Sequence, residues 1–238
     1  MPVIEYKEEN LGNYVVPNDV KNGICVDIGA NVGGFLKKNA YKFQKVHFYE
    51  PQSHCFEICS ALKISNATGF KEAVYKNCNE TLSMVAHKNF ESGSVALKSD
   101  TINEDWDNNT IEEVKTVDLK TVLQRVDGKI DFMKIDCETG EYNFFINQNL
   151  RPIKYIAMEP HWQMGKEKYD ELFSHIQRTH YLLGDATWHE SPSSNKEVLF
   201  VNKETVGYLR FIRLRFFVKL IRNPWRRFSR IMSKISAD

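Results

Sequence analysis

Glycine, asparagine and acidic residues follow the first apolar segment of the chain, in a spacing that suits a nucleotide-like ligand. Residues 26–34 read VDIGANVGG, and an acid follows the next apolar segment, 46–49. Glycines at the carboxyl end of a parallel strand let the backbone come close to a ligand. An acid about 20 residues further on suits the two hydroxyls of a ribose. The pattern predicts a site for an adenosine-type cofactor, formed by Asp27, Gly29, Asn31, Gly33 and Glu50.

The residues around these glycines favour one adenosine cofactor over two others. Asn31 stands where the dinucleotide pattern GxGxxG has the glycine that admits a pyrophosphate, which weakens the NAD interpretation. Phe35 and Leu36 stand where a phosphate-binding loop has Lys followed by Ser or Thr. Asp27 would repel a phosphate but attract an amino group. These features favour S-adenosylmethionine, which carries an amino acid tail and a sulfonium but no phosphate.

Two more polar clusters come at the ends of predicted strands, where open α/β sheets bind ligands. Asp136 and Glu138 lie in the segment KIDCETGE, and His161 lies in MEPHW. These three side chains are the candidates to take or shuttle a proton. A divalent metal held by Asp136 and Glu159 is an alternative, although the sequence has no fixed metal-ligand spacing. The structural alternative for each cluster is a solvated strand end with a helix-capping acid.

Strand-like and helix-like segments alternate along the body of the chain. This alternation predicts an α/β fold, with a mostly parallel, seven-stranded sheet and helices on both faces. Residues 76–116 interrupt the alternation, with a hairpin expected from 81–86 and 95–97 and a polar loop at 102–110. Strands are expected at 24–28, 46–49, 68–74, 130–135, 153–158, 181–183 and 198–201, and helices at 35–43, 53–63, 117–125, 141–149 and 166–179.

Length and composition are those of one globular enzyme domain. The chain has 238 residues, of which 42% are hydrophobic and 26% charged. An uncharged apolar run long enough to span a membrane is absent from the sequence, and the polar N-terminus does not resemble a signal peptide. The five cysteines form no CxxC pair and no zinc spacing, which favours reduced thiols and a cytoplasmic location.

The net charge of +1 hides a basic C-terminal segment. Residues 207–238 hold nine Lys and Arg but only one acid, Asp238. From Phe217 onward the apolar residues fall on one helical face, and the basic residues fall on the other. We expect three parts: an N-terminal segment 1–19, an enzyme domain 20–206 and basic amphipathic helices in 207–238. A basic face opposite aromatic residues suits the surface of an anionic membrane, which would make the protein peripherally membrane-associated. Docking of these helices on the body and nucleic-acid binding are the alternatives.

The order of the motifs resembles that of the FkbM-type methyltransferases, which are class I S-adenosylmethionine-dependent enzymes. The resemblance covers about residues 20–203 and rests on VDIGANVGG, YEP, KTVDL, KIDCETGE and MEPHW. It implies a Rossmann-like class I fold and methyl transfer to a hydroxyl of a sugar, glycan or related small molecule. The family usually has acid-x-acid-Gly-x-acid in the second cluster, whereas this chain has Thr139 at the glycine position and Gly140 after it.

A nucleic-acid-modifying methyltransferase that uses the basic segment to bind RNA or DNA is the alternative function. The body of the chain argues against it, because residues 1–206 hold 23 basic and 30 acidic residues. A phosphate backbone would be repelled by this negative charge. The chain also lacks the Pro-Pro-aromatic tetrapeptide, led by Asn or Asp, of many base methyltransferases. We therefore expect a small-molecule or glycan acceptor.

Overall fold

The structure is a computed structural model that describes residues 14–87, 93–95, 109–183 and 197–207, with positions 209, 211–213 and 215. The predictions made for 1–13, for most of the loop 102–110 and for 216–238 lie outside the described residues. No helix in the described part of the chain is both long enough and apolar enough to cross a membrane.

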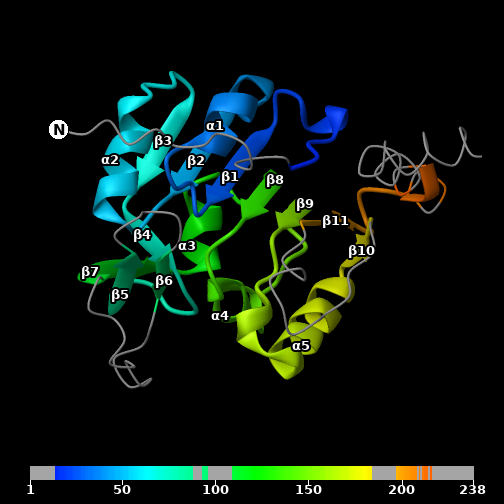
Figure 1. Cartoon of the computed structure of the whole chain (residues 1–238). Helices are drawn as coiled ribbons and strands as arrows, with labels where there is room; N and C mark the ends of the chain where they lie inside the picture. Colours follow the sequence, from blue (N-terminus) through cyan, green and yellow to red (C-terminus); the bar gives the residue numbers. More distant parts are fainter. Residues whose placement is uncertain are drawn as a thin grey trace, which may run out of the picture.

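The predicted α/β fold with a mostly parallel, seven-stranded sheet is confirmed (Figure 1). The strand order is β3-β2-β1-β8-β9-β11-β10, and β11 is the strand that runs antiparallel to both of its neighbours. This order places β1 and β8 side by side at the centre, where the chain direction across the sheet reverses. The strands are β1 Ile24–Ile28, β2 Lys45–Tyr49, β3 Ala67–Phe70, β8 Ile130–Ile135, β9 Ile153–Met158, β10 His180–Leu182 and β11 Val198–Asn202.

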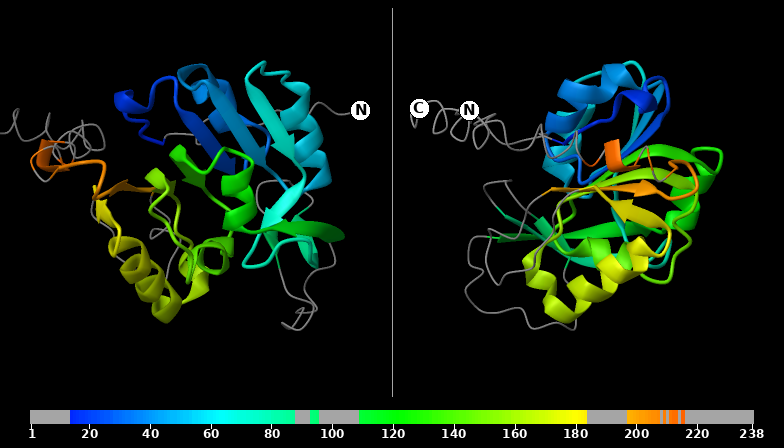
Figure 2. Two further views of the ribbon diagram at one scale, coloured as in Figure 1. Left: turned by 180° about the vertical axis from the view of Figure 1, so that it is seen from behind. Right: turned by 90° about the vertical axis from the view of Figure 1, so that its right-hand side faces the viewer.

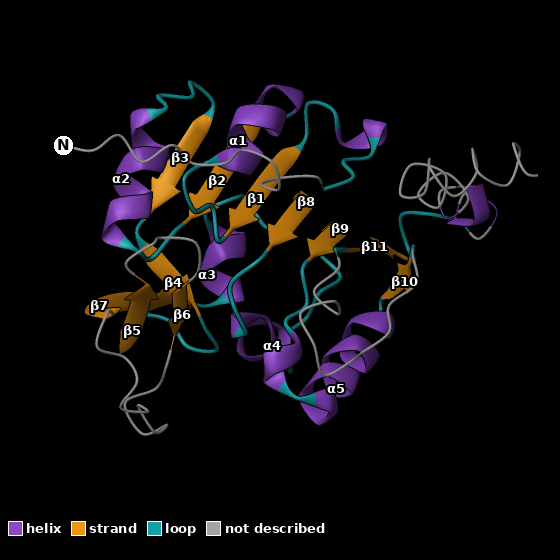
Figure 3. Cartoon of the chain, viewed as in Figure 1, coloured by secondary structure: helices purple, strands orange, loops and turns teal. Residues whose placement is uncertain are grey.

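Helices cover both faces of this sheet, and successive strand residues alternate between two cores. Cys25 packs with the side chains of α1 and α2, whereas the next residue, Val26, packs with those of α3, α4 and α5. The views in Figures 2 and 3 show α1 and α5 on opposite sides of the sheet. The α-helices are α1 Gly34–Asn39, α2 Ser53–Ala61, α3 Leu119–Gln124, α4 Gly140–Phe145 and α5 Lys166–Gln177; short 3-10 helices are η1 Asn18–Val20, η2 Ala40–Lys42 and η3 Trp162–Met164.

A second, four-stranded sheet occupies the region where the alternation was expected to fail. Its order is β4-β7-β5-β6, and β5 pairs antiparallel with β6 as the predicted hairpin requires. The single strand predicted at 68–74 is wrong in one respect, because it divides after Phe70 and its second half joins this other sheet. The strands are β4 Glu72–Val74, β5 Thr81–His87, β6 Gly93–Val95 and β7 Asn109–Val117.

Strand β7 was not predicted, and the loop assigned to 102–110 overlaps its start. The adjacent acids Glu112 and Glu113 weaken the apolar alternation that marks a strand, yet the buried Val114 packs between β-strands of the second sheet. The helix predicted from 117 begins instead at Leu119. Asp118 caps it, because its carboxylate accepts the Thr121 N–H at 2.8 Å.

The first described residues of the C-terminal segment contact the body of the protein. The Phe211 ring stacks on Tyr181, with ring centroids 4.4 Å apart, and Phe211 is part of the core under α1. Leu209 and Ile212, in contrast, are exposed.

The backbones of β1 and β8 approach each other most closely just beyond the strand ends. Gly29 has φ of +72°, and a Cβ built there would lie 1.7 Å from the carbonyl oxygen of Asp136. The Asp136 N–H donates in turn to the Ile28 carbonyl at 3.1 Å. Only glycine fits at position 29, so the first motif and the second cluster are held together by a contact that excludes any side chain.

We expect Gly29→Ala to destabilise the protein by several kcal/mol, because it combines a left-handed backbone with a collision against a backbone oxygen. Gly128→Ala is the matched control: Gly128 has φ of +83°, but its Cβ would meet nothing within 4 Å. The control should lose only about 1 kcal/mol, the cost of the backbone conformation alone. Urea denaturation measures both values, and equal losses would show that the close contact does not matter.

Candidate active site

Glu50 organises the turn that follows β1. Its two carboxylate oxygens accept the N–H groups of Asn31 at 2.8 Å and Gln52 at 2.9 Å. The Gly29 and Ala30 N–H groups donate to the Tyr49 carbonyl at 3.0 and 3.2 Å. Glu50 is 4% exposed, and burial raises its pKa to about 7 although both backbone hydrogen bonds oppose the shift. The acid at the end of β2 thus fixes the shape of the glycine turn after β1.

This turn has the features that S-adenosylmethionine requires. A carboxylate oxygen can accept two hydrogen bonds. Each Glu50 oxygen accepts one from the backbone, so Glu50 retains acceptor capacity for the ribose hydroxyls. Gly29 leaves no side chain between the turn and β8. Gly33 (φ +81°) and Asn31 (φ +49°) both have left-handed backbones that turn the chain into α1. Gly29, Asn31, Gly33 and Glu50 therefore fit the group, and their contacts with it stay a prediction.

Asp27, the fifth predicted cofactor residue, is fully buried beneath the turn. Its carboxylate lies 3.3 Å from the ammonium of Lys134, which also donates to the carbonyls of Ile28 and Gly29. Burial opposes the charge of Lys134, but Asp27 and Asp136 outweigh it and the pKa of Lys134 is raised. Lys134 had no role in the sequence analysis. The signal that pointed to one was a lysine between the buried apolar residues Met133 and Ile135 of a strand.

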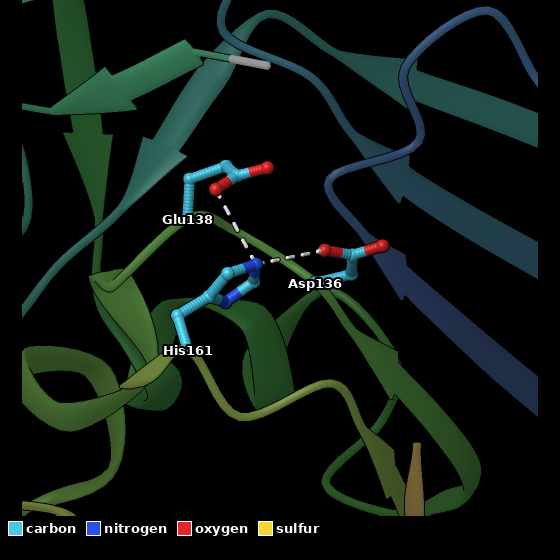
Figure 4. A group of neighbouring side chains, drawn as sticks. All are labelled: Asp136, Glu138 and His161. Atoms are coloured by element: carbon cyan, nitrogen blue, oxygen red, sulfur yellow. Dashed lines mark ion pairs between the residues drawn. The ribbon is translucent and has the colours of Figure 1, made fainter. Parts of the chain in front are cut away.

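The three proton-transfer candidates meet at the ends of β8 and β9 (Figure 4). The Nε2 atom of His161 lies 3.7 Å from an Asp136 oxygen and 3.3 Å from a Glu138 oxygen. Each of the three residues places one potential ligand atom within 4.8 Å of the others. His161 is 2% exposed, whereas both carboxylate side chains are 30% exposed. We call Asp136, Glu138 and His161 the strand-end trio.

Glu141 sets the orientation of the His161 ring from the other side. Its carboxylate is fully buried and lies 2.7 Å from His161 Nδ1. Burial alone would lower the pKa of His161, but Glu141, Glu138 and Asp136 outweigh it and raise this pKa to about 10. The sequence analysis assigns no role to Glu141. Its position on the first turn of α4 directs it back toward the strand end.

Two more side chains surround the trio. The Tyr14 hydroxyl, from the N-terminal segment, donates to Asp136 at 3.3 Å. The carboxyl of Glu159 follows β9, and burial together with Asp136 raises its pKa to about 7. Neither Tyr14 nor its contact could be predicted, because the hydrogen bond spans 122 residues of sequence.

The backbone that presents Glu138 is strained. Glu138 has φ of +49° and Thr139 has φ of +79°, and both values lie in the left-handed region that favours glycine. The Gly140 N–H donates to the Cys137 carbonyl at 3.1 Å and closes this turn. The departure from the family pattern, threonine in place of glycine, therefore falls at a position where the backbone has a glycine-like conformation.

Comparison with known proteins identifies the class to which this protein belongs. The family described as "Methyltransferase FkbM domain" matches residues 27–183, which is more than half of the chain. This chain belongs to the FkbM methyltransferase family. Its class is that of the S-adenosylmethionine-dependent methyltransferases. A search of the curated proteins finds none that matches it.

Several solved structures match this chain at low similarity. The FkbM methyltransferase from Methylobacillus flagellatus has 15% identity and a TM-score of 0.46 over 74% of this chain, which spans only 42% of that protein. An rRNA methylase from Streptococcus thermophilus has 11% identity and a TM-score of 0.41, covering 78% of this chain and 90% of its own. A methyltransferase from Streptococcus mutans, solved with SAH, has 10% identity and a TM-score of 0.42, covering 76% and 87%.

The raised pKa of Glu50 predicts a stability that depends on pH. The folded state binds the Glu50 proton more tightly than the unfolded chain, whose pKa is near 4.5. This contribution is present below pH 4.5 and is lost as the pH rises through about 7. Relative to Glu50→Gln, the wild-type protein should lose about 3 kcal/mol between pH 4 and pH 8. Denaturant titrations at several pH values test this, and a constant difference would contradict it.

Replacement of the strained Thr139 should stabilise the fold. We expect Thr139→Gly to raise the free energy of unfolding by about 1 kcal/mol, because relief of the left-handed backbone exceeds the added chain entropy of glycine. Thermal denaturation measures the change. A loss of stability would show that the Thr139 side chain makes a contact worth more than the strain.

Proposed function

We propose that the protein transfers the methyl group of S-adenosylmethionine to a hydroxyl oxygen of a sugar, a glycan or a related small molecule. The observation that carries the proposal is the meeting of Asp136, Glu138 and His161 at the strand ends beside the Gly29 turn. Family membership supports the donor. The acidic, partly exposed surroundings support an uncharged polar acceptor.

The chemistry requires alignment and removal of one proton. S-adenosylmethionine supplies a methyl carbon that its sulfonium has already activated. The acceptor oxygen forms a bond to this carbon while the carbon–sulfur bond breaks, and the hydroxyl proton must leave. The protein's part is to hold the acceptor in line and to lower the cost of losing that proton.

Different residues would bind the cofactor and promote loss of the hydroxyl proton. Glu50 and the Gly29 turn lie at the end of β1 and β2, where they would fix the adenosine portion of the cofactor. The trio lies next to them, across the Gly29–Asp136 contact, and its two carboxylates are partly exposed. A hydroxyl bound between these two groups would meet the trio on the side where its proton leaves.

A sugar hydroxyl is a weak acid, so loss of the trio should affect turnover more than cofactor binding. We expect Asp136→Asn, Glu138→Gln and His161→Ala to retain SAH binding, and at least one to lose about 100-fold in turnover. Glu50→Ala should instead weaken SAH binding by about 1.5–3 kcal/mol, the cost of losing charge-assisted hydrogen bonds. Isothermal titration measures binding, and single-turnover labelling measures transfer.

The acceptor class is tested by labelling a cell extract with S-adenosylmethionine that carries a tritiated methyl group. Label should enter the glycan, lipid or small-metabolite fractions and should resist both ribonuclease and mild base. Entry of label into RNA alone would contradict the proposed acceptor. Wild-type levels of labelling by all three trio variants would contradict the role given to the trio.

A further inference from the structure

The strand-end trio combines a buried imidazole with two partly exposed carboxylates, which is more than a proton-transfer group requires. Nε2 of His161 faces both acids at 3.3 and 3.7 Å, and both distances exceed the 2.7–2.9 Å of a charge-assisted hydrogen bond between such groups. The imidazole is therefore directed between the two carboxylates rather than at one of them (Figure 4).

The spacing of these atoms is that of ligands around one ion. Two ligand atoms about 2.1 Å from a shared ion lie about 3.0 Å apart at a right angle and about 3.4 Å apart at a tetrahedral angle. The two distances from His161 Nε2 are within a few tenths of an ångström of this range. All three ligand atoms lie within 4.8 Å of one another, so a small rotation of either partly exposed carboxylate would complete the set.

The second nitrogen of His161 has the partner that a metal-bound histidine usually has. Nδ1 lies 2.7 Å from the carboxylate of Glu141, which is fully buried. A carboxylate that accepts the N–H of one ring nitrogen fixes the ring, and a metal that binds the other nitrogen displaces its proton. Glu141 therefore orients Nε2 toward the two acids, and it does so from an element, α4, that contributes no ligand itself.

The local charge also favours a bound cation. The carboxylates of Asp136, Glu138, Glu141 and Glu159 all act electrostatically on His161 or on one another. Within the described part of the chain, Lys134 lies 3.8 Å from Asp136, but Asp27 already pairs with that lysine. A divalent ion would neutralise charge that the neighbouring side chains leave uncompensated.

We propose that Asp136, Glu138 and His161 bind a divalent transition-metal ion, with Glu141 as the residue that positions His161. One nitrogen and two carboxylate oxygens suit Mn²⁺ or Zn²⁺ better than Mg²⁺ or Ca²⁺, which prefer oxygen ligands alone. Both carboxylates are partly exposed, so the remaining coordination positions of the ion would face solvent.

The ion would deepen the proposed function, on which this role rests. An acceptor hydroxyl bound to the ion would lose its proton more readily, and the proton would be released to water. The oxygen would then form the bond to the methyl carbon as the carbon–sulfur bond breaks. The trio would act as ligands, so none of its members would serve as the base.

Titration of the metal-free, full-length protein with Mn²⁺ tests the site without any methyl transfer. The electron paramagnetic resonance signal of free Mn²⁺ should decrease until one ion is bound per chain, below about 1 mM. Asp136→Asn, Glu138→Gln and His161→Gln should each weaken binding more than 10-fold. Glu57→Gln, on the exposed surface of α2, is the matched control and should bind like the wild type.

Substitutions of Glu141 test whether this residue positions His161 for metal binding or only supports the fold. Glu141→Ala should weaken Mn²⁺ binding about 10–100-fold, whereas Glu141→Gln keeps an acceptor oxygen for His161 Nδ1 and should restore most of the affinity. Circular dichroism verifies that each variant is folded. Glu138→Gln, which changes a partly exposed side chain, keeps the test valid if a buried substitution fails to fold.

The result that overturns the site is a folded wild-type protein that binds no Mn²⁺ or Zn²⁺ at 1 mM, about the weakest affinity of functional cation sites. Stoichiometric binding that all three trio variants retain would also overturn it, because the ion would then lie elsewhere. SAH titration separates this outcome from failure of the proposed function. SAH binding without metal binding refutes the cation site alone, whereas metal binding without SAH binding refutes the proposed function and leaves the site intact.

Discussion

The contact between the Gly29 turn and the Asp136 backbone is the constraint on which the rest of the site depends. The two central strands, β1 and β8, end at the same level, and the absence of a side chain at position 29 lets their continuations touch. Lys134 reinforces the junction from below, because it pairs with Asp27 and donates to the carbonyls of Ile28 and Gly29. The turn proposed to bind the cofactor and the trio proposed to act on the acceptor are therefore joined by one backbone contact.

Buried charge is arranged in two layers around this junction. In the lower layer, Asp27 and Lys134 are enclosed and neutralise each other. In the upper layer, Asp136 and Glu138 are partly exposed and converge on His161, which Glu141 holds from behind. An enclosed pair supports the fold, whereas partly exposed groups around a fixed imidazole can exchange a proton, an ion or a substrate oxygen. This separation explains why a single motif, KIDCETGE, contains residues of both kinds.

The sequence predicted the strands of the main sheet and the candidate site residues better than it predicted the contacts between side chains. Apolar strands bounded by turn residues predicted all seven strands of the main sheet, and strand ends predicted where Asp136, Glu138 and His161 would meet. Strand β7 escaped prediction, because the pair Glu112–Glu113 masks its alternation. The roles of Lys134, Glu141 and Tyr14 also escaped it, because each depends on contacts that only the folded chain creates. Spacing along the chain shows which residues reach an edge of the sheet, but not which of them pair.

The central claim is that the cofactor turn and the strand-end trio serve one reaction centre. It is tested most directly by a crystal structure of the protein grown with SAH and Mn²⁺, with anomalous diffraction to locate the ion. The account predicts that the ribose contacts Glu50, that the thioether sulfur faces the trio, and that an anomalous peak lies between Asp136, Glu138 and His161. SAH bound with its sulfur directed away from these residues would contradict it.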